Sequence, residues 1–452
     1  MAGKATPADG VVTGFGTIDG RMASVIAYDF TVMAGSMGKT AEIKCNRARE
    51  IAYTKRMPMI WLIDSAGARI QEAIGSRNFA GSGLLFREES IMSGVVPQVA
   101  AMMGPGAAGT AYIPALADFV PMVKGTSNMA LGGPPLVKAV VGEEISAEDL
   151  GGSRVHCEIS GVGDLEVADD RACLDAIRTY LSYFPSNNTE RPPVAVCADP
   201  VDRRDAELLD IVPDSARRAY DVKKVVRAIV DRESFFEIKP GWAKNIVVGL
   251  ARLDGAPVGV VANQPLVLGG ALDLDAADKA ARFIMLCDAF NVPLVFFQDV
   301  PGFMVGSKVE RAGIIRHGAK MLYAVSEATV PKLTVVQRKA YGAGYFVMCG
   351  RGYEPDLIVA WPTAEISVMG PEGGTNIIFR KEIAAAANPE DERARRIADF
   401  RKLIDPYVAA GAALIDDVID PRETRPTLVR ALQMAKTKKV ERPWKKHGVM
   451  PV

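Results

Sequence analysis

Short apolar runs of strand length alternate with segments of helical period along most of the chain. The first unit of this pattern begins at Asp19-Gly20, a dipeptide typical of tight hairpins, and continues through a strand and a helix to a buried strand ending at Asp64. Another helix and a Val-Pro strand then lead into a turn of tiny residues at 104–110. Strands and helices that alternate in this way predict an α/β layered domain.

The pattern occurs a second time at a nearly constant offset. Asp64 and Asp299 end matching strands and lie 235 residues apart. The same separation relates Asp19-Gly20 to Asp254-Gly255, Gly35 to Gly270, Lys44 to Lys279 and Ala108-Gly109 to Ala343-Gly344, while Val96-Pro97 matches Val330-Pro331 one residue short. A sustained offset indicates duplication. We therefore predict two similar domains, over residues 1–215 and 216–452.

The segment between the copies has no counterpart in the first copy. It is rich in Pro near 190–193, is helical in pattern over 222–230 and becomes strand-like over 234–238. Subtracting the offset places the equivalent of this helix and strand before residue 1. Either the first copy has lost them or another polypeptide supplies them.

Composition limits the classes of function. The chain has 54 basic and 54 acidic side chains, so no net field attracts it to nucleic acid or to an anionic membrane. Its six cysteines are scattered without a C-x-x-C pair and it has only three histidines, which argues against a metal site in this chain, a disulfide framework or a His-based triad. With no signal-like or membrane-length apolar segment, we expect a cytoplasmic protein.

Each copy carries a turn of tiny residues that could perform chemistry. Such turns, at 104–110 and 339–345, let a ligand approach the backbone, and N–H groups at a helix start can point at developing negative charge. Each could therefore be an oxyanion hole. Close packing of a helix on a strand is the favoured explanation of a single such turn, but two turns at matched positions favour function.

Longer strings carry a resemblance to known families. Ser65-Ala-Gly-Ala-Arg-Ile-Gln-Glu72 resembles the segment of crotonase enzymes whose backbone amides bind an acyl-CoA thioester. Nearly the whole chain resembles the β, or carboxyltransferase, subunits of acyl-CoA carboxylases such as propionyl-CoA and methylcrotonyl-CoA carboxylase. The strings that carry this resemblance include Gly132-Gly-Pro134, Glu143 to Gly152, Asn263-Gln-Pro265, Asp299-Val-Pro-Gly-Phe303, Gly313 to Lys320, Ala360-Trp-Pro362 and Val368 to Gly373.

The resemblance implies a duplicated crotonase (ClpP/crotonase-like) α/β fold with an acyl-CoA side in the first domain and a biotin side in the second. It implies that Ala108 and Gly109 stabilise the acyl-CoA enolate, while Ala343 and Gly344 stabilise the biotin enolate. Since the donors would be backbone N–H groups, an Ala at a position where the family has Gly is tolerable if its φ is negative. Proton transfer to the freed biotin nitrogen would make a protein base unnecessary.

Substrate contacts and partners are implied in the same way. Gly67, Ala68 and Phe303 lie in the matching strings. Arg69 is a candidate contact for the coenzyme A phosphates, but solvated surface charge is the favoured explanation of it. Phe346 either lines the acyl pocket or is a core aromatic. The family implies biotin carried by a partner biotin carboxylase/biotin carrier subunit, a coenzyme A thioester substrate and a homohexamer within a hetero-complex.

Three functions remain open at this stage. The first is transfer of a carboxyl group from carboxybiotin to the α or vinylogous carbon of an acyl-CoA. The second is a biotin-dependent acyl-CoA decarboxylase or transcarboxylase subunit that runs similar chemistry in reverse. The third is a non-catalytic scaffold subunit. The residues do not single out the acyl group.

Overall fold

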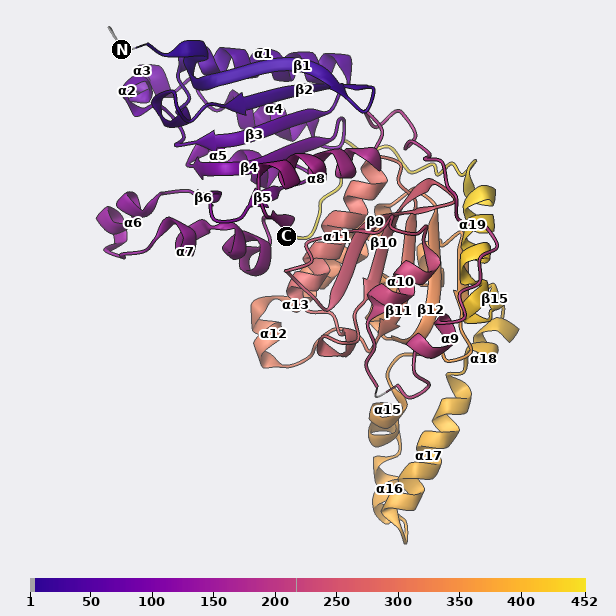
Figure 1. The fold of residues 1–452 in the computed structure, drawn as a ribbon. Helices are drawn as coiled ribbons and strands as arrows, with labels where there is room; N and C mark the ends of the chain where they lie inside the picture. The colour runs from indigo at the N-terminus through magenta and orange to yellow at the C-terminus, as the bar shows by residue number, and fades with distance from the viewer. Residues whose placement is uncertain (1–4, 217) are drawn as a thin grey trace. The chain divides into compact units, whose positions relative to one another are not determined.

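The computed structural model describes residues 5–216 and 218–452, which divide into two compact units (Figure 1). Unit 1 comprises Met1–Pro193 with Ile238–Trp242 and Ala289–Asn291, and unit 2 comprises the remainder. The division falls at Pro193 instead of residue 215, because the segment that follows Pro193 packs its helices on the sheet of unit 2. Among the described residues, no helix combines the length and hydropathy needed to cross a membrane.

Unit 1 is built on a seven-stranded mixed sheet. Its order is β1-β2-β3-β4-β5-β7 with β6 beside β4, where β1 is Val11–Ile18, β2 Arg21–Tyr28, β3 Met59–Ser65, β4 Gln98–Ala107, β5 Pro121–Val123, β6 Asn128–Ala130 and β7 Leu165–Val167. The β1–β2 hairpin is antiparallel and turns at Asp19-Gly20. Both residues have positive φ, as a two-residue type I′ turn requires. The strands that follow pair in parallel because helices connect them.

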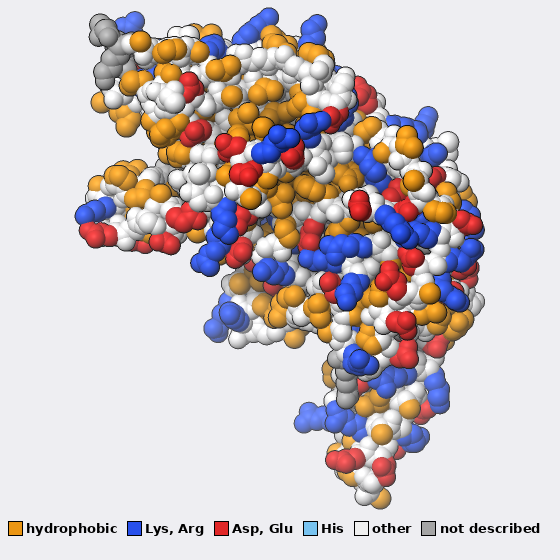
Figure 2. Space-filling view, in the orientation of Figure 1, with side chains coloured by type: hydrophobic (Ala, Val, Ile, Leu, Met, Phe, Trp, Pro, Cys, Tyr) orange, Lys and Arg blue, Asp and Glu red, His pale blue; other side chains and the backbone are white. Residues whose placement is uncertain are grey.

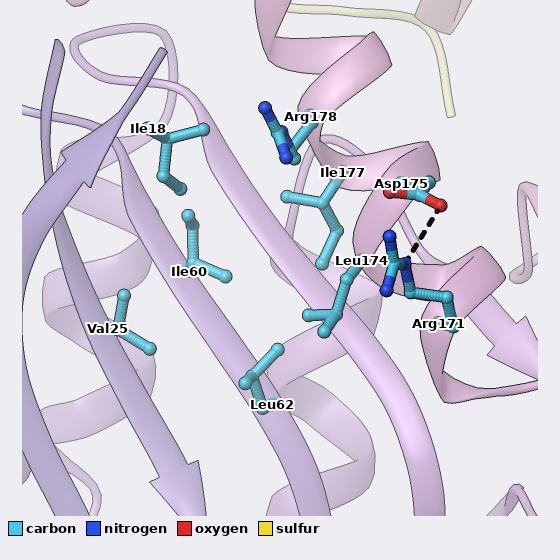
Figure 3. Close-up of a pocket in the computed structure, with 9 residues that line it drawn as sticks. All are labelled: Ile18, Val25, Ile60, Leu62, Arg171, Leu174, Asp175, Ile177 and Arg178. Atoms are coloured by element: carbon cyan, nitrogen blue, oxygen red, sulfur yellow. Dashed lines mark ion pairs between the residues drawn. The ribbon is translucent and has the colours of Figure 1, made fainter. Parts of the chain in front are cut away.

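Helix α1 packs on one face of this sheet, and α8 lies against the other face. Ile26, Trp61 and Ile63 project from the first face and pack with Cys45 and Ala48 of α1. Figure 2 shows hydrophobic side chains gathered over β1–β3, and a cavity of about 460 Å³ lies between these strands and α8 (Figure 3). The helices are α1 Lys39–Lys55, α2 Ile70–Ala73, α3 Ser76–Phe79, α4 Leu84–Met92, α5 Gly109–Leu116, α6 Pro134–Val141, α7 Ala147–Gly151 and α8 Asp170–Ser182. A π-helical segment spans Val155–Ser160.

Unit 2 repeats the plan on an eight-stranded sheet. Its order is β15-β13-β12-β11-β10-β9-β8 with β14 beside β12, where β8 is Phe236–Ile238, β9 Ile246–Leu253, β10 Ala256–Asn263, β11 Leu294–Val300, β12 Lys332–Tyr341, β13 Leu357–Ala360, β14 Glu365–Ser367 and β15 Asp417–Val418. The β9–β10 hairpin turns at Asp254-Gly255, again with positive φ. The expected duplication is confirmed.

Helices lie on both faces of the central strands of unit 2. In Figure 1, α10 lies in front of β10 and β11, and its valines pack into the same buried cluster as these strands. The helices are α9 Leu208–Ile211, α10 Val222–Ile229, α11 Leu274–Ala289, α12 Ser307–Ala312, α13 Ile314–Glu327, α14 Ala343–Val347, α15 Pro371–Ile378, α16 Arg380–Ala385, α17 Pro389–Leu403, α18 Pro406–Gly411 and α19 Thr424–Ala435. The predicted helix over 222–230 and strand over 234–238 correspond to α10 and β8.

The two copies change offset between their third and fourth strands. Ile63 pairs with Met102 in unit 1, and Gln298 pairs with Val336 in unit 2, so the later strands correspond at 234 residues instead of 235. The same one-residue difference separates Val96-Pro97 from Val330-Pro331, which lie 234 residues apart. As a result Ala108 corresponds to Gly342, and Gly109 to Ala343.

Candidate active site

The turn between β4 and α5 holds Ala108 in an unusual backbone conformation. Its φ is 52° and its ψ is −118°, a region that normally only glycine adopts. The condition under which an alanine is tolerable here, a negative φ, is therefore not met. The N–H of Ala108 donates to the carbonyl oxygen of Ala130 at 3.1 Å, as part of the β4–β6 pairing, so it is not available to a ligand.

The next two residues present the free N–H groups of this turn. Gly109 and Thr110 are the first residues of α5, where no preceding turn of helix supplies an acceptor. Neither N–H has an acceptor among the residues that the structure describes. The Thr110 hydroxyl donates to the carbonyl of Ala107 at 2.8 Å and fixes the first turn of the helix. The helix start thus offers two adjacent donors with the positive end of the dipole behind them.

The matching turn in unit 2 has the same geometry. Gly342 has φ 56° and ψ −141°, and its N–H donates to the carbonyl of Ser367 at 2.9 Å. Ala343 and Gly344 open α14, and within the described part of the chain their N–H groups find no acceptor. A Cβ at Gly344 would lie 2.7 Å from a methyl carbon of Val300, so only glycine fits there.

Gly67 brings a second turn against the start of α5. Its φ is 91°, and a Cβ there would lie 2.6 Å from the carbonyl oxygen of Ala107. The turn is anchored by Ser65, whose hydroxyl accepts from the N–H of Gly67 at 3.1 Å and donates to Gly35 at 2.8 Å. Ala68 follows at the surface, and its N–H has no acceptor in the described chain. The structure therefore brings Gly67 and Ala68 to the α5 turn.

Arg69 is a structural residue instead of a phosphate contact or a solvated charge. Its side chain is 3% exposed and forms ion pairs with Asp9 and with Glu72, the latter at 3.0 Å, and it donates to the carbonyl of Ser36 at 2.8 Å. Glu72 also accepts from the N–H of Lys39 at the start of α1 at 3.1 Å, and these two contacts lower the pKa of its carboxyl. With its donors used in this way, Arg69 is not free to bind coenzyme A.

The two phenylalanines differ in environment. The Phe303 ring packs on Gly318 of α13, where a Cβ would lie 3.2 Å from the ring. Phe346 is 47% exposed on α14, two residues after Gly344, and its ring stacks beside Tyr353 with centroids 6.2 Å apart. The alternative of a core aromatic is therefore wrong for Phe346. A role in the acyl pocket stays a prediction.

The carboxylates at the ends of β3 and β11 have different surroundings. Asp299 is fully buried and forms ion pairs with Arg338 at 2.9 Å and Lys339 at 3.3 Å. Arg338 in turn donates to three backbone carbonyls of residues 213–218, which ties that loop to β12. Asp64 faces Gly104 instead, and burial raises the pKa of its carboxyl. Sequence reasoning missed this difference because the basic partner has no counterpart in the first copy.

Two of the three histidines are engaged in packing. His317 contacts Asp278 of α11 at 2.8 Å, as expected for a packed residue, and His156 bonds the carbonyl of Met129 and the hydroxyl of Ser160. Burial lowers the pKa of His156. Over residues 5–216 and 218–452, no three His, Cys, Asp or Glu side chains come together as metal ligands.

Comparison with known proteins shows the family of the chain. The family model of the carboxyl transferase domain matches residues 1–450. The chain is 47% identical to methylmalonyl-CoA decarboxylase subunit alpha of Veillonella parvula and 48% identical to the propionyl-CoA carboxylase carboxyltransferase subunit of Haloferax mediterranei, each over 99% of this chain and 86% of the relative. A crystal structure of the transcarboxylase 12S hexamer with methylmalonyl-coenzyme A bound superposes with a TM-score of 0.94 at 48% identity, covering 98% of this chain and 85% of that one.

Proposed function

The chain belongs to the carboxyl transferase family, and on that premise we propose that it transfers a carboxyl group from carboxybiotin on a partner subunit to the α carbon, or its vinylogous equivalent, of an acyl-CoA. The family establishes an enzyme that moves carboxyl groups between biotin and acyl-CoA. The observation that supports the finer statement is the pair of matched turns, each with two adjacent N–H groups that lack an acceptor among the described residues.

The chemistry requires such donors because the α-proton of an acyl-CoA is weakly acidic and its removal places negative charge on the thioester oxygen. In unit 1, Gly109 and Thr110 donate to that oxygen, with Ala68 as a third donor from the adjoining turn. Ala108, the residue first expected in this role, serves instead to position them through its bond to Ala130. One well-placed donor of this kind contributes roughly 3–4 kcal/mol to the transition state.

In unit 2, Ala343 and Gly344 donate to the ureido oxygen of biotin. The residues fit this group because a neutral urea carbonyl that gains negative charge needs backbone donors at close range, and the glycine at 344 keeps the approach free of side-chain atoms. Carboxybiotin supplies the carboxyl group and then a basic nitrogen for the α-proton. No protein base is needed, which agrees with the packing of His156 and His317.

The relatives suggest the substrate. The two named above act, by their names, on methylmalonyl-CoA or propionyl-CoA, and the transcarboxylase 12S structure holds methylmalonyl-coenzyme A. We therefore assign propionyl-CoA and methylmalonyl-CoA as the substrate pair, biotin on a carrier subunit as the partner group, and a homohexamer like that of the 12S protein as the assembly.

Proline substitution tests the donors, because proline removes one N–H and suits the first position of a helix. Ala343→Pro and Gly109→Pro should each lower the rate of carboxyl transfer from methylmalonyl-CoA to free biotin by about 10²–10³-fold. The matched variants Ala343→Gly and Gly109→Ala keep the N–H and should retain most of the rate. Equal losses in both members of a pair, or full activity of the proline variants, would refute the donor assignment.

A second direction of reaction is favoured by one relative. The 47% identical protein from Veillonella parvula is named as a decarboxylase subunit, so the chain could serve net decarboxylation. Assay of the purified complex with ATP, bicarbonate and propionyl-CoA distinguishes the two. ATP-dependent appearance of methylmalonyl-CoA supports the carboxylase, whereas release of carbon dioxide from methylmalonyl-CoA without ATP-dependent carboxylation supports the decarboxylase.

A further inference from the structure

The turn that holds the unit 2 donors is bound to a short strand, β14, that also carries a helical arm. The carbonyl of Ser367 in β14 accepts from the N–H of Gly342 at 2.9 Å, and Gly342 directly precedes the donors Ala343 and Gly344. The chain then continues into α15, α16 and α17, which form an arm over residues 371–403 that extends away from the sheet of unit 2 (Figure 1). All residues of α16 and α17 are exposed or half-buried. The strand β14 is therefore shared by the donor turn and the arm.

Both ends of the arm are attached to β14. Helix α15 follows this strand in the sequence, and the N–H of Ile366 in β14 donates to the carbonyl of Ile404, directly after α17, at 2.9 Å. The helices α15 and α17 also pack on each other. A Cβ at Gly374 would lie 2.7 Å from the ring of Phe400, and Arg401 donates to Glu372 at 2.9 Å. A displacement of α17 is therefore transmitted to β14.

Side chains form a second connection from the arm to the donor turn. Tyr341 is the last residue of β12, and its buried hydroxyl donates to one carboxylate oxygen of Glu365 in β14. The other oxygen of Glu365 lies 3.6 Å from Nε of Arg401 in α17. The ring of Tyr341 lies against Gly370, where a Cβ would be 3.1 Å from it. Contacts therefore run from Arg401 through Glu365 to Tyr341, which is bonded covalently to the turn.

Unit 1 shows that this connection is not needed to build such a turn. The turn of unit 1 bonds to β6 as the turn of unit 2 bonds to β14. In this alignment the counterparts of Tyr341 and Glu365 are Ala107 and Asn128, and an alanine has no polar group for such a bond. The two turns nevertheless share the same unusual backbone conformation. The link in unit 2 therefore has a role beyond forming the turn.

We propose that Tyr341, Glu365 and Arg401 are positioning residues, which couple the placement of the arm to the alignment of Ala343 and Gly344 at the biotin site. The inference rests on the proposed function, because that function assigns these two N–H groups to the ureido oxygen. Alignment matters because a displacement of about 1 Å can cost about 10²-fold in rate. The coupling acts on the reaction at biotin and leaves the binding of acyl-CoA in unit 1 unchanged.

Tyr341→Phe tests the link at the turn, because it keeps the ring and removes the hydroxyl. In carboxyl transfer from methylmalonyl-CoA to free biotin, kcat should fall by about 10- to 100-fold, while KM for methylmalonyl-CoA stays the same. The amide of Gly342 should exchange faster with solvent deuterium, because its bond to Ser367 opens more often. The thermal midpoint, measured in parallel, reports any loss of folded protein.

Arg401→Ala tests the link to the arm. Because this ion pair is partly exposed, kcat should fall by only about two- to fivefold, again with faster exchange at Gly342. Lys402→Ala is the matched control, since it removes the neighbouring cation, which pairs with Asp399 at 2.9 Å, and it should behave as the parent chain does. Glu365→Gln keeps an acceptor for the Tyr341 hydroxyl and should lose no more than Arg401→Ala. Adding Arg401→Ala to Glu365→Gln should have little further effect.

The outcomes separate the coupling from the donor assignment. An unchanged kcat or unchanged exchange at Gly342 in Tyr341→Phe overturns the coupling, as do equal effects of Arg401→Ala and Lys402→Ala. A fall in kcat that matches a loss of folded protein, with faster exchange throughout unit 2, assigns a purely structural role and also overturns it. If Ala343→Pro and Ala343→Gly differ as expected while Tyr341→Phe has no effect, the proposed function stands and the coupling alone fails. Full activity of Ala343→Pro refutes both.

Discussion

The strained alanine at the start of α5 allows a sharp test of the turn geometry. At φ 52° and ψ −118°, the Cβ of Ala108 is held in a conformation that strains a non-glycine residue by about 1–3 kcal/mol. Ala108→Gly removes that strain, while the added freedom of glycine in the unfolded chain offsets about 0.4–1 kcal/mol. We expect a net stabilisation of about 1–2 kcal/mol.

The assay is calorimetric. For a unit of about 200 residues, each kcal/mol shifts the midpoint by about 2–4 °C, so the transition of unit 1 should rise by roughly 2–8 °C. Because the N–H of residue 108 is bonded to Ala130 in either case, the rate of carboxyl transfer should change little.

Two reciprocal variants serve as controls. Gly342→Ala should destabilise unit 2, because it introduces the same strain and places a Cβ 3.1 Å from the carbonyl oxygen of Val368. Ala343→Gly makes the same chemical change as Ala108→Gly at an ordinary helical position and should be neutral or destabilising by up to about 1 kcal/mol. A lower midpoint for Ala108→Gly, or no effect of Gly342→Ala, would refute the assigned backbone geometry.

Three further changes have defined outcomes. Burial raises the pKa of Glu89 to about 8, so the stability tied to its bound proton is complete below about pH 4 and is lost as pH rises through 8. Glu89→Gln should therefore stabilise the protein increasingly over that range, by on the order of 4 kcal/mol at pH 9. A difference in the free energy of urea unfolding that does not change with pH would contradict this. Arg69→Ala should lower the free energy of unfolding, measured in urea, by about 3–5 kcal/mol, because it leaves the carboxylates of Asp9 and Glu72 without their basic partner. An unchanged KM for acyl-CoA in the folded fraction would separate this structural role from coenzyme A binding. Phe346→Ala should change stability by less than about 1 kcal/mol but alter relative rates across a panel of acyl-CoA substrates, and unaltered ratios would remove Phe346 from the acyl pocket.

Much of the site could be predicted from local pattern. The Asp19-Gly20 and Asp254-Gly255 hairpins, the buried strands ending at Asp64 and Asp299, and the turns of tiny residues all follow from short-range rules of backbone conformation, and the repeat made them easier to recognise. The sequence therefore determined the α/β class, the duplication and the position of the two turns of tiny residues.

Tertiary structure decided the rest. Strand register depends on pairing between distant segments, so only the pairing of β4 with β6 showed that the N–H of Ala108 is bonded to Ala130. Burial likewise depends on non-local packing. A charge pattern could not show that Arg69 is buried beneath Asp9 and Glu72. Periodicity could not show that a sheet face covered by α10 in unit 2 is open in unit 1. Both features depend on which distant parts of the chain pack nearby.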